Sequence, residues 1–393
     1  MLLSQKHKGV SHARNLGLSY ATGEYINFLD SDDYLSENTL KDISEFFDKC
    51  GDKTDVAAIP MFYFGNYEGK HELNYKFKKT AVIDLDKEPN TLQFSISSAF
   101  IKHELLEDDF STDLICSEDI LLLYKILLKK KTLGVVDSAS YYFRKRNGIN
   151  YSDTFQFKKE FYNERLEKFH LNLIDYSKSD EGNVPLFVQY MLAYDLKTII
   201  EQEHLFMCET AEDENQLFAN LKEVSSCIDD DVILNNEFLS DSLKLFFYDL
   251  SRDNIHVEYE QNNVFLKIDD LIVDKLRSHK IWLNRVDLSG NILNLLGSFS
   301  SYFDNKNIAI EGVKTLKNGE KVAFASSYID SLSGCDITYL SKPIHYQHHF
   351  DLKVPFNSND KNIMIKLIYH KNGDRTDFSD ENTISFYLNN DTS

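Results

Sequence analysis

The spacing of apolar residues divides the chain into three regions. In the first, residues 1–150, short apolar segments alternate with stretches whose apolar residues recur at helical spacing. The short segments predict strands and the longer stretches predict helices. The expected strands cover residues 2–5, 24–29, 55–64 and 133–137, and the expected helices cover residues 11–21, 37–50 and 117–131. Ser11 is the expected N-cap of the first helix, and one face of the second helix is expected to carry Leu40, Ile43, Phe46 and Phe47. Such alternation is typical of an α/β fold.

The periodicity changes twice further along the chain. Residues 151–254 repeat apolar positions at helical spacing and predict a helical subdomain, with one face formed by Tyr162, Leu166, Phe169, Leu173 and Tyr176. Residues 255–393 alternate with a period of two, and Asn318-Gly319 and Asn372-Gly373 are strong hairpin signals. We therefore expect an α/β domain, then a helical region, and then a C-terminal antiparallel β-sandwich.

Composition and charge narrow the range of partners and locations. The 393 residues carry a formal net charge of −20 at pH 7, which disfavours nucleic acid and anionic membrane surfaces because both reward Lys and Arg. No apolar run is long enough for a transmembrane helix, so any membrane association is expected to be peripheral. The five cysteines form no Cys-x-x-Cys pair, and the first residues lack a signal-peptide core. We expect a cytoplasmic protein with reduced thiols, acting in solution or at the inner face of the membrane.

The segment 23–35 combines an apolar strand with three carboxylates. The expected strand ends in Asp30-Ser31-Asp32-Asp33. Two carboxylates about 4 Å apart repel by roughly 4 kcal/mol at an effective dielectric of 20, so the cluster is either fully solvated or neutralised by a divalent cation. Carboxylate oxygens suit Mg²⁺ or Mn²⁺. The alternative is a solvated turn in which Asp33 or Ser36 caps the next helix.

The residues around this turn resemble family-2 glycosyltransferases. The family pattern is a Gly-[Val/Ile]-Ser/Ala-x-Ala-Arg-Asn-x-Gly helix, a Gly-[Glu/Asp]-[Tyr/Phe] turn, and an apolar strand that ends in Asp-x-Asp-Asp. The matching positions here are Gly9, Ser11, Ala13, Arg14, Asn15, Gly17, Ala21, Gly23, Glu24, Tyr25, Asp30, Asp32 and Asp33. A match of this extent is far more specific than an isolated Asp-x-Asp.

The resemblance implies a GT-A fold and a nucleotide-sugar donor, with a UDP-sugar expected. Asp30 and Asp32 would contact the ribose and hold Mn²⁺ or Mg²⁺ on the diphosphate, with Asp33 as a further metal ligand. Such an ion neutralises the leaving diphosphate as the sugar–phosphate bond breaks. Arg14 matches a residue that contacts the base or its surroundings, and the alternative for Arg14 is a surface salt bridge.

A second acidic pair, Glu118-Asp119, opens the expected helix over 117–131. Family members carry a Glu-Asp pair in this place, and the resemblance implies that Asp119 is the general base that takes the acceptor's proton in an inverting transfer. Glu118 would be its neighbour. The alternative is an ordinary helix start, in which Ser117 caps the helix and the acids complement its dipole. Both interpretations can hold at once.

The segment 141–150 resembles the family's Tyr-x-Tyr-Arg strand and the basic loop that follows it. This resemblance implies that Arg144 and Arg146 reach the donor diphosphate. The alternative is an exposed loop with solvated charges. Two other parts of the family pattern do not appear, namely the first strand with its Pro-x-Tyr-Asn ending and the Val-Asp-Asp-Gly-Ser turn. We therefore expect residues 1–150 to be a partial, N-terminally truncated GT-A domain that binds nucleotide sugar weakly.

Three functions follow from these observations. The order of domains resembles bacterial glycosyltransferases of teichoic acids and capsular polysaccharides, which implies a metal-dependent inverting glycosyltransferase with a glycan or teichoic acid acceptor. The C-terminal domain would then contact the polymer or form a homo-oligomer. A nucleotidyltransferase would also use paired acids and Mg²⁺, but it needs a Gly-rich basic loop that does not appear. The third alternative is an inactive remnant that serves as a glycan-binding or assembly module.

Overall fold

The computed structural model describes most of the chain, which folds into two compact units. The described residues are 1–106, 110–146, 161–201, 210–252, 254–260, 263–304, 307–328, 334–357, 362–371 and 374–376. The first unit comprises Met1–Ile199 and Phe206–Phe238, and the second comprises Ile200–Leu205 and Leu239–Ser393. The domain boundaries expected at residues 150 and 254 stay predictions.

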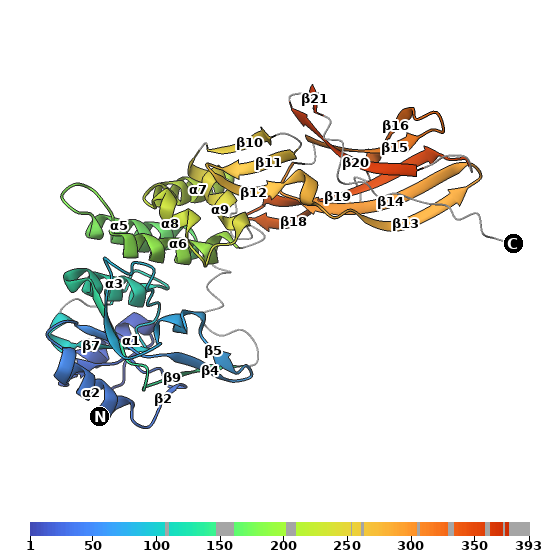
Figure 1. Cartoon of the computed structure of the whole chain (residues 1–393). Coiled ribbons are helices and arrows are strands. Elements are labelled where there is room, and N and C mark those ends of the chain that lie inside the picture. Colours follow the sequence, from blue (N-terminus) through green and yellow to red (C-terminus); the bar gives the residue numbers. More distant parts are fainter. Residues whose placement is uncertain are drawn as a thin grey trace. The chain divides into compact units, whose positions relative to one another are not determined.

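Two mixed sheets form the centre of the first unit (Figure 1). The larger sheet has the strand order β1-β7-β3-β8-β6, and the smaller sheet has the order β2-β9-β4-β5. Strand β3 pairs with β8, and β4 with β9, in parallel. The strands are β1 Tyr25–Ile26, β2 Tyr34–Leu35, β3 Val56–Ala58, β4 Met61–Gly65, β5 Gly69–Lys70, β6 Ala81–Asp84, β7 Ala99–Lys102, β8 Thr132–Val135 and β9 Tyr141–Lys145.

Helix α2 shows how the apolar spacing builds the core of this unit. Ile43, Phe46 and Phe47 from α2 are buried against residues of the sheets such as Phe100 and Tyr141. Phe46 lies over Gly134 of β8, where a Cβ atom would come within 2.6 Å of its ring. The helices of the first unit are α1 Val10–Leu18, α2 Thr39–Cys50, α3 Glu118–Lys130, α4 Asn163–Arg165, α5 Asn172–Ser177, α6 Leu186–Ile200, α7 Ala211–Ser226 and α8 Asp230–Leu234.

Several local expectations for the first unit are wrong. Leu40 is 67% exposed, because the core-facing side of α2 is narrower than the spacing suggested. Helix α1 begins at Val10, so its N-cap is Gly9, two residues before the expected Ser11, and Ser11 is buried inside the helix. Residues 2–5 form no strand. The strand expected over 24–29 is only Tyr25–Ile26, since the chain then leaves the sheet toward the acidic turn.

The helical region continues the first unit after residue 160. Helices α4 and α5 are joined by a π-helical segment, Leu166–Leu171, and α5 packs on α3. The expected apolar face is buried at four of its five positions, and Tyr176 is exposed.

The second unit contains helix α9, Asp241–Ser251, and three antiparallel sheets. The sheet order is β10-β11-β12 in the first, β13-β14-β19-β17 with β18 on β19 in the second, and β16-β15-β20-β21 in the third. The strands are β10 Ile255–Glu260, β11 Asn263–Ile268, β12 Leu271–Lys275, β13 Trp282–Ser289, β14 Ile292–Ser301, β15 Ile308–Thr315, β16 Lys321–Ala325, β17 Ser327–Tyr328, β18 Gly334–Tyr339, β19 Lys342–Pro355, β20 Asn362–Lys371 and β21 Asp374–Thr376.

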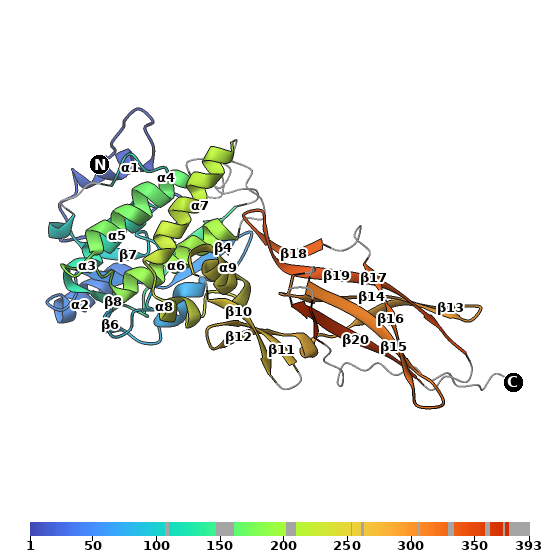
Figure 2. The same cartoon turned by 90° about the horizontal axis from the view of Figure 1, so that it is seen from above.

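The two larger sheets of this unit pack face to face as a β-sandwich. Strand β15 contacts β19, and β15 and β20 overlap β14 and β19 when the unit is seen from above (Figure 2). Gly312 of β15 approaches the side chains of Leu352 and Val354, so a larger residue would not fit there. Asn318-Gly319 joins β15 to β16 with Gly319 at φ 85°, as the hairpin signal predicted, while Asn372-Gly373 lies outside the described residues. The order of an α/β domain, helices and an antiparallel sandwich confirms the expected fold class.

Candidate functional site

Every site residue predicted from the sequence lines one cleft of the first unit. The cleft has a volume of about 610 Å³. Its walls come from the start of α1, the acidic turn, the start of α3, strand β9 with the residue that follows it, and the first residues of the helical region. The lining residues are Val10, Arg14, Asp30, Ser31, Asp32, Asp33, Ile115, Cys116, Ser117, Glu118, Asp119, Phe143, Arg144, Arg146, Phe161 and Arg165.

Asp33 fastens the acidic turn to strand β9. Its Oδ2 atom accepts a 2.6 Å hydrogen bond from the Tyr141 hydroxyl, and its Oδ1 atom accepts a 2.8 Å bond from the Arg144 backbone N–H. Burial raises the pKa of Asp33, and these two hydrogen bonds oppose the shift without cancelling it. The capping alternative is wrong for this turn, because the N-cap of α2 is Asn38 rather than Asp33 or Ser36.

The other two acids of the turn face cations. Asp32 Oδ2 lies 2.6 Å from Arg146 Nη2, while the Arg144 Nε–H donates to the backbone oxygen of Asp32 at 3.1 Å. Asp30 is more loosely held, with Arg14 Nη2 at 3.6 Å and the Ser97 hydroxyl at 3.4 Å. Within the part of the chain that the structure describes, no three His, Cys, Asp or Glu side chains are grouped so as to hold a metal ion.

The second acidic pair sits at a sharp turn into α3. Ser117 takes the N-cap position with φ 65° and ψ 11°, a left-handed conformation that costs a serine about 1–2 kcal/mol. Its side chain makes no capping hydrogen bond, so the capping interpretation holds for the position but not for the side chain. Strained residues of this kind are concentrated at functional sites. The turn directs Glu118 and Asp119 to the cleft that the acidic turn also lines.

Both acids of this pair have raised pKa values. Burial, followed by the charge of Asp119, raises the pKa of Glu118 to about 7, although Arg14 opposes the shift. Burial also raises the pKa of Asp119, against the opposing effects of Arg14 and of hydrogen bonds from backbone amides that include that of Ile96. A carboxylate poised near neutral pH is suited to accept a proton during catalysis.

Helix α1 ties the two acidic segments together through consecutive residues. Arg14 is largely buried and donates a 2.9 Å hydrogen bond from Nη1 to Glu118 Oε1, so it is not part of a surface salt bridge. Its guanidinium also lies 5.4 Å from the ring centre of Phe110. The Asn15 amide clamps the backbone of Phe110, accepting from its N–H at 2.8 Å and donating to its oxygen at 3.0 Å. The contact of Arg14 with a nucleotide base stays a prediction.

Sequence reasoning missed two residues of the cleft, Phe161 and Arg165. Both follow the segment that resembles the family, so no motif pointed to them. The sequence did offer one signal: Arg165 directly precedes Leu166, which belongs to the apolar face of the predicted helix. A charged residue in that position is rarely buried without a partner.

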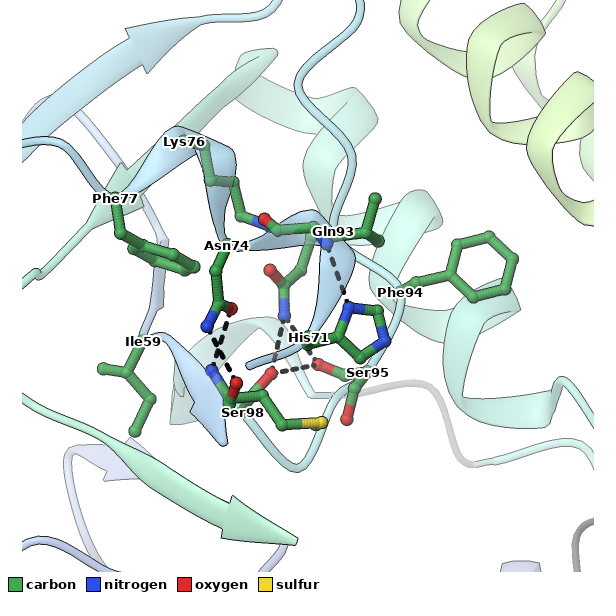
Figure 3. A pocket seen from close by; sticks show the side chains of 11 residues that line it. Ile59, His71, Asn74, Lys76, Phe77, Gln93, Phe94, Ser95 and Ser98 are labelled. Atoms are coloured by element: carbon green, nitrogen blue, oxygen red, sulfur yellow. Dashed lines mark hydrogen bonds between the residues drawn. The ribbon is translucent and has the colours of Figure 1, made fainter. Parts of the chain in front are cut away.

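A second cavity borders Met61 at the start of strand β4, and Figure 3 shows the side chains around it. Its volume is about 20 Å³, which is room for one water molecule. Asn74 holds its rim by accepting from the Met61 N–H at 3.0 Å and donating to the Met61 oxygen at 2.8 Å. Burial lowers the pKa of Lys76 to about 7, and its Nζ atom donates to the backbone oxygens of Leu73 and Leu92. The cavity is a structural feature, because it is too small for a substrate.

Comparison with known proteins assigns the region that carries the acidic turn. Residues 1–110 match the family model described as glycosyl transferase family 2. The N-terminal domain is a family-2 glycosyltransferase domain. The chain is 34% identical, over 312 residues, to the minor teichoic acid biosynthesis protein GgaB of Bacillus subtilis, covering 77% of this chain and 34% of GgaB.

Two further comparisons point to one Staphylococcus aureus protein. The chain is 32% identical over 159 residues to poly(ribitol-phosphate) beta-N-acetylglucosaminyltransferase TarS, covering 39% of this chain and 27% of TarS. The crystal structure of TarS 1-349 in complex with UDP-GlcNAc aligns with a TM-score of 0.47 and 21% identity, covering 68% of this chain and 79% of that one. The chain thus spans about a third of the length of these curated relatives. None of the helices in the described residues has the length and apolar character that a membrane crossing requires.

Proposed function

We propose that this chain transfers a sugar, with inversion, from a nucleotide-sugar donor to a teichoic acid or another cell-surface polysaccharide. The single observation that carries the proposal is the cleft itself, which places the acidic turn, the Glu118-Asp119 pair and four arginines around one volume. The names of GgaB and TarS support the acceptor class, and the UDP-GlcNAc complex of TarS supports a UDP-sugar as the donor.

The acidic turn and strand β9 form the proposed donor side of the cleft. Arg144 and Arg146 lie beside Asp32 and offer donors to a diphosphate. Asp30 is 44% exposed at its side chain and has only long contacts, which leaves its oxygens available to a ribose. In this arrangement Arg146 would exchange its contact with Asp32 for one with the donor.

The carboxylates fit a divalent cation only in part. Both oxygens of Asp33 accept hydrogen bonds from the protein, so Asp33 is better suited to shape the turn than to bind metal. One oxygen of Asp32 pairs with Arg146, which leaves the other for a cation, and Asp30 can supply a second ligand. Mg²⁺ and Mn²⁺ are often held by one or two carboxylates, with phosphate and water completing the shell. When bound, such an ion would supply positive charge beside the leaving diphosphate.

Asp119 is the proposed general base of the transfer. Its carboxylate is held at the start of α3 by hydrogen bonds from backbone amides, and burial raises its pKa, which makes it a stronger base than an exposed aspartate. Glu118 is held in place by Arg14, so its charge would stay at a fixed position beside Asp119. The acceptor hydroxyl would give its proton to Asp119 while the hydroxyl oxygen attacks the sugar carbon. The bond from that carbon to the diphosphate then breaks on the opposite face, which inverts the configuration.

A transfer assay with matched variants tests this function. Asp119→Asn and Asp32→Asn should each lower kcat by roughly 10²-fold or more, the loss expected for removal of a general base or of a metal ligand. Asp52→Asn is the control, because Asp52 is an exposed carboxylate of the same unit that does not line the cleft. The donors to try are UDP-sugars, with Mn²⁺ or Mg²⁺ present.

The outcomes separate the two functions left open by the sequence. Wild-type turnover by Asp119→Asn would contradict its assignment as the base. No transfer from any donor, together with retained binding of a teichoic acid or glycan, would instead favour a binding or assembly module. A cytoplasmic location, peripheral membrane association and a homo-oligomer formed through the C-terminal domain stay predictions.

A further inference from the structure

We propose that Arg165 is a substrate-binding residue of the cleft, and that its Nε–H donates a hydrogen bond to an anionic phosphate oxygen. This inference rests on the proposed function, because it assigns the phosphate to a substrate of the transfer. The phosphate belongs either to the diphosphate of the donor or to a phosphodiester of the acceptor. The chemistry is the same in both cases, so the experiment must distinguish the two sources.

The helical region holds Arg165 at the cleft wall by an unusual local structure. Helix α4 ends at Arg165, and the π-helical segment Leu166–Leu171 follows directly. A π-helix closes its turn at i→i+5, so Arg165 and His170 lie one turn apart on the same face. Both side chains can therefore reach Asp195 of α6: Arg165 Nη2 contacts its Oδ1 atom, and His170 Nε2 lies 2.7 Å from its Oδ2 atom. In an α-helix, a spacing of five residues would separate the two side chains around the helix.

This network fixes the guanidinium in one orientation. Asp195 and His170 are fully buried, and the Arg165 side chain is 8% exposed. Burial tends to raise the pKa of Asp195, but Arg165 and His170 outweigh it and the pKa is lowered, so the carboxylate is charged. Burial lowers the pKa of His170, so its ring is neutral and donates from Nε2. The ring of Phe161, 4.8 Å from the guanidinium carbon, limits its remaining movement.

One buried nitrogen of Arg165 has no partner in this arrangement. Nη2 contacts Asp195 and Nη1 contacts Thr198 at 3.4 Å, but Nε is buried and has no hydrogen-bond partner in the structure described. Buried donors are almost always paired, so an unpaired one calls for an explanation. Arg165 also lines the cleft, as do Ser117 and Glu118. A ligand in the cleft that accepts from Nε–H would complete the pairing.

The chemistry of the donor selects phosphate as the acceptor of this bond. A guanidinium offers directed N–H groups that match the oxygens of phosphate, and the bond to an anionic oxygen is stronger than one to a sugar hydroxyl. Five carboxylates line the same cleft, so an anionic ligand needs the arginines of the cleft to offset their repulsion. A phosphate would have its charge shared among Arg165 and the arginines on the β9 side.

Direct observation of the Nε–H group tests the proposal without requiring turnover. Protein labelled with ¹⁵N at arginine Nε would be studied by two-dimensional NMR, in which a buried Nε–H exchanges slowly enough to be seen, and Arg165→Lys would assign the signal. The probes are UDP with Mg²⁺ for the donor and glycerophosphoglycerol for a phosphodiester acceptor. A saturable shift of the Arg165 signal with either probe supports the proposal and identifies the source. A signal that moves with neither probe overturns it.

A pair of variants separates binding by Arg165 from a purely structural role. Asp195→Asn and the double variant Arg165→Gln/Asp195→Asn both lack the charge of Asp195, and they differ only at Arg165. The proposal expects the double variant to have a KM roughly tenfold or more higher for the phosphate-bearing substrate, with kcat little changed. Equal KM values in the two variants would overturn it. If the enzyme transfers no sugar at all, the NMR result still decides the role of Arg165, while the proposed function fails by itself.

Discussion

Arg14 donates a 2.9 Å hydrogen bond to Glu118, a residue 104 positions further along the chain. The same guanidinium lies 3.6 Å from Asp30, so one cation connects the acidic turn to the start of α3. Because Glu118 is buried beside Asp119, the charge of Arg14 offsets part of the cost of keeping two acids together. The two halves of the site are therefore coupled electrically, and a change at Arg14 should alter the titration of both acids.

Replacing Arg14 by Gln should move the acidic limb of the pH–rate profile to higher pH. Arg14 lowers the pKa of Glu118, which burial has raised to about 7, so its removal lets that pKa rise further and leaves the acid pair protonated over a wider range. A shift of about one pH unit or more is expected from the loss of an adjacent cation. Measuring kcat/KM against pH checks this, with Arg14→Lys retaining part of the effect. Arg285→Gln, on the exposed strand β13, is the control. An unmoved limb would show that Arg14 does not tune the pair.

Removing the charge of Asp33 and removing that of Asp32 should have different effects on the free energy of unfolding. Asp33→Asn weakens the hydrogen bonds from the Tyr141 hydroxyl and the Arg144 N–H, and should lower the free energy of unfolding by about 1–3 kcal/mol. Asp32→Asn disturbs an ion pair with the exposed Arg146 and should change the free energy of unfolding by less than about 1 kcal/mol, while it lowers kcat as proposed above. Urea unfolding of both variants, with Tyr141→Phe as a second way to remove one bond, makes the comparison. Equal destabilisation by the two substitutions would refute the structural role of Asp33.

The residues of the candidate site were easier to predict from the sequence than the bounds of the helices and strands that position them. The acidic turn, Arg14 and the Glu118-Asp119 pair were found because their chemistry depends on residue types in short, contiguous patterns. Arg165 and its link to Asp195 were not found, since they meet through tertiary packing and a π-helical segment that leaves no recognisable local signal. The sequence also predicted the wrong N-cap for α1, because backbone conformation outweighed side-chain preference there. Ser11 has a favourable capping side chain, but Gly9 takes the position with φ 97°, a conformation that glycine adopts more readily than serine.

Gly134 and Gly17 should give opposite results when each is replaced by Ala. A Cβ at Gly134 would lie 2.6 Å from the Phe46 ring and 2.9 Å from the Val56 oxygen, so Gly134→Ala forces α2 away from the sheet and should cost about 1–3 kcal/mol. Gly17 lies within α1 with no atom within 4 Å of the added carbon, and Gly17→Ala should stabilise the unit by about 0.5–1 kcal/mol. Thermal unfolding of the two variants measures both effects. A neutral Gly134→Ala would mean that the core under α2 adapts to an added methyl group.

His170 should make the first unit sensitive to mild acid. Burial lowers the pKa of His170 in the folded chain, whereas an unfolded histidine takes up a proton near pH 6.5. The unfolded state therefore takes up this proton first as the pH falls below about 6.5, and the contribution of His170 to the free energy of unfolding should decrease by up to about 1.4 kcal/mol per pH unit until the folded-state ring also titrates. Glu118 contributes with the opposite sign, because its raised pKa makes the folded state bind a proton more readily than the unfolded state, so the effect of His170 is measured as a difference between variants. Asp195 adds nothing over this range, because its lowered pKa places its contribution at more acidic pH.

Urea unfolding of the first unit at several values between about pH 5 and about pH 8 would reveal this slope. His170→Gln removes the titrating ring and weakens the contact with Asp195, so it lowers stability at every pH. The difference in the free energy of unfolding between wild type and this variant should shrink as the pH falls from about 7 to about 5, because only the wild type loses the contribution of the ring. His256→Gln is the matched control, since His256 is exposed on β10 of the second unit and should leave the slope of the first unit as it is. If His170→Gln kept the wild-type slope, the acid sensitivity would have to come from another group. The neutral ring of His170, which contacts Asp195, would then not explain the pH dependence.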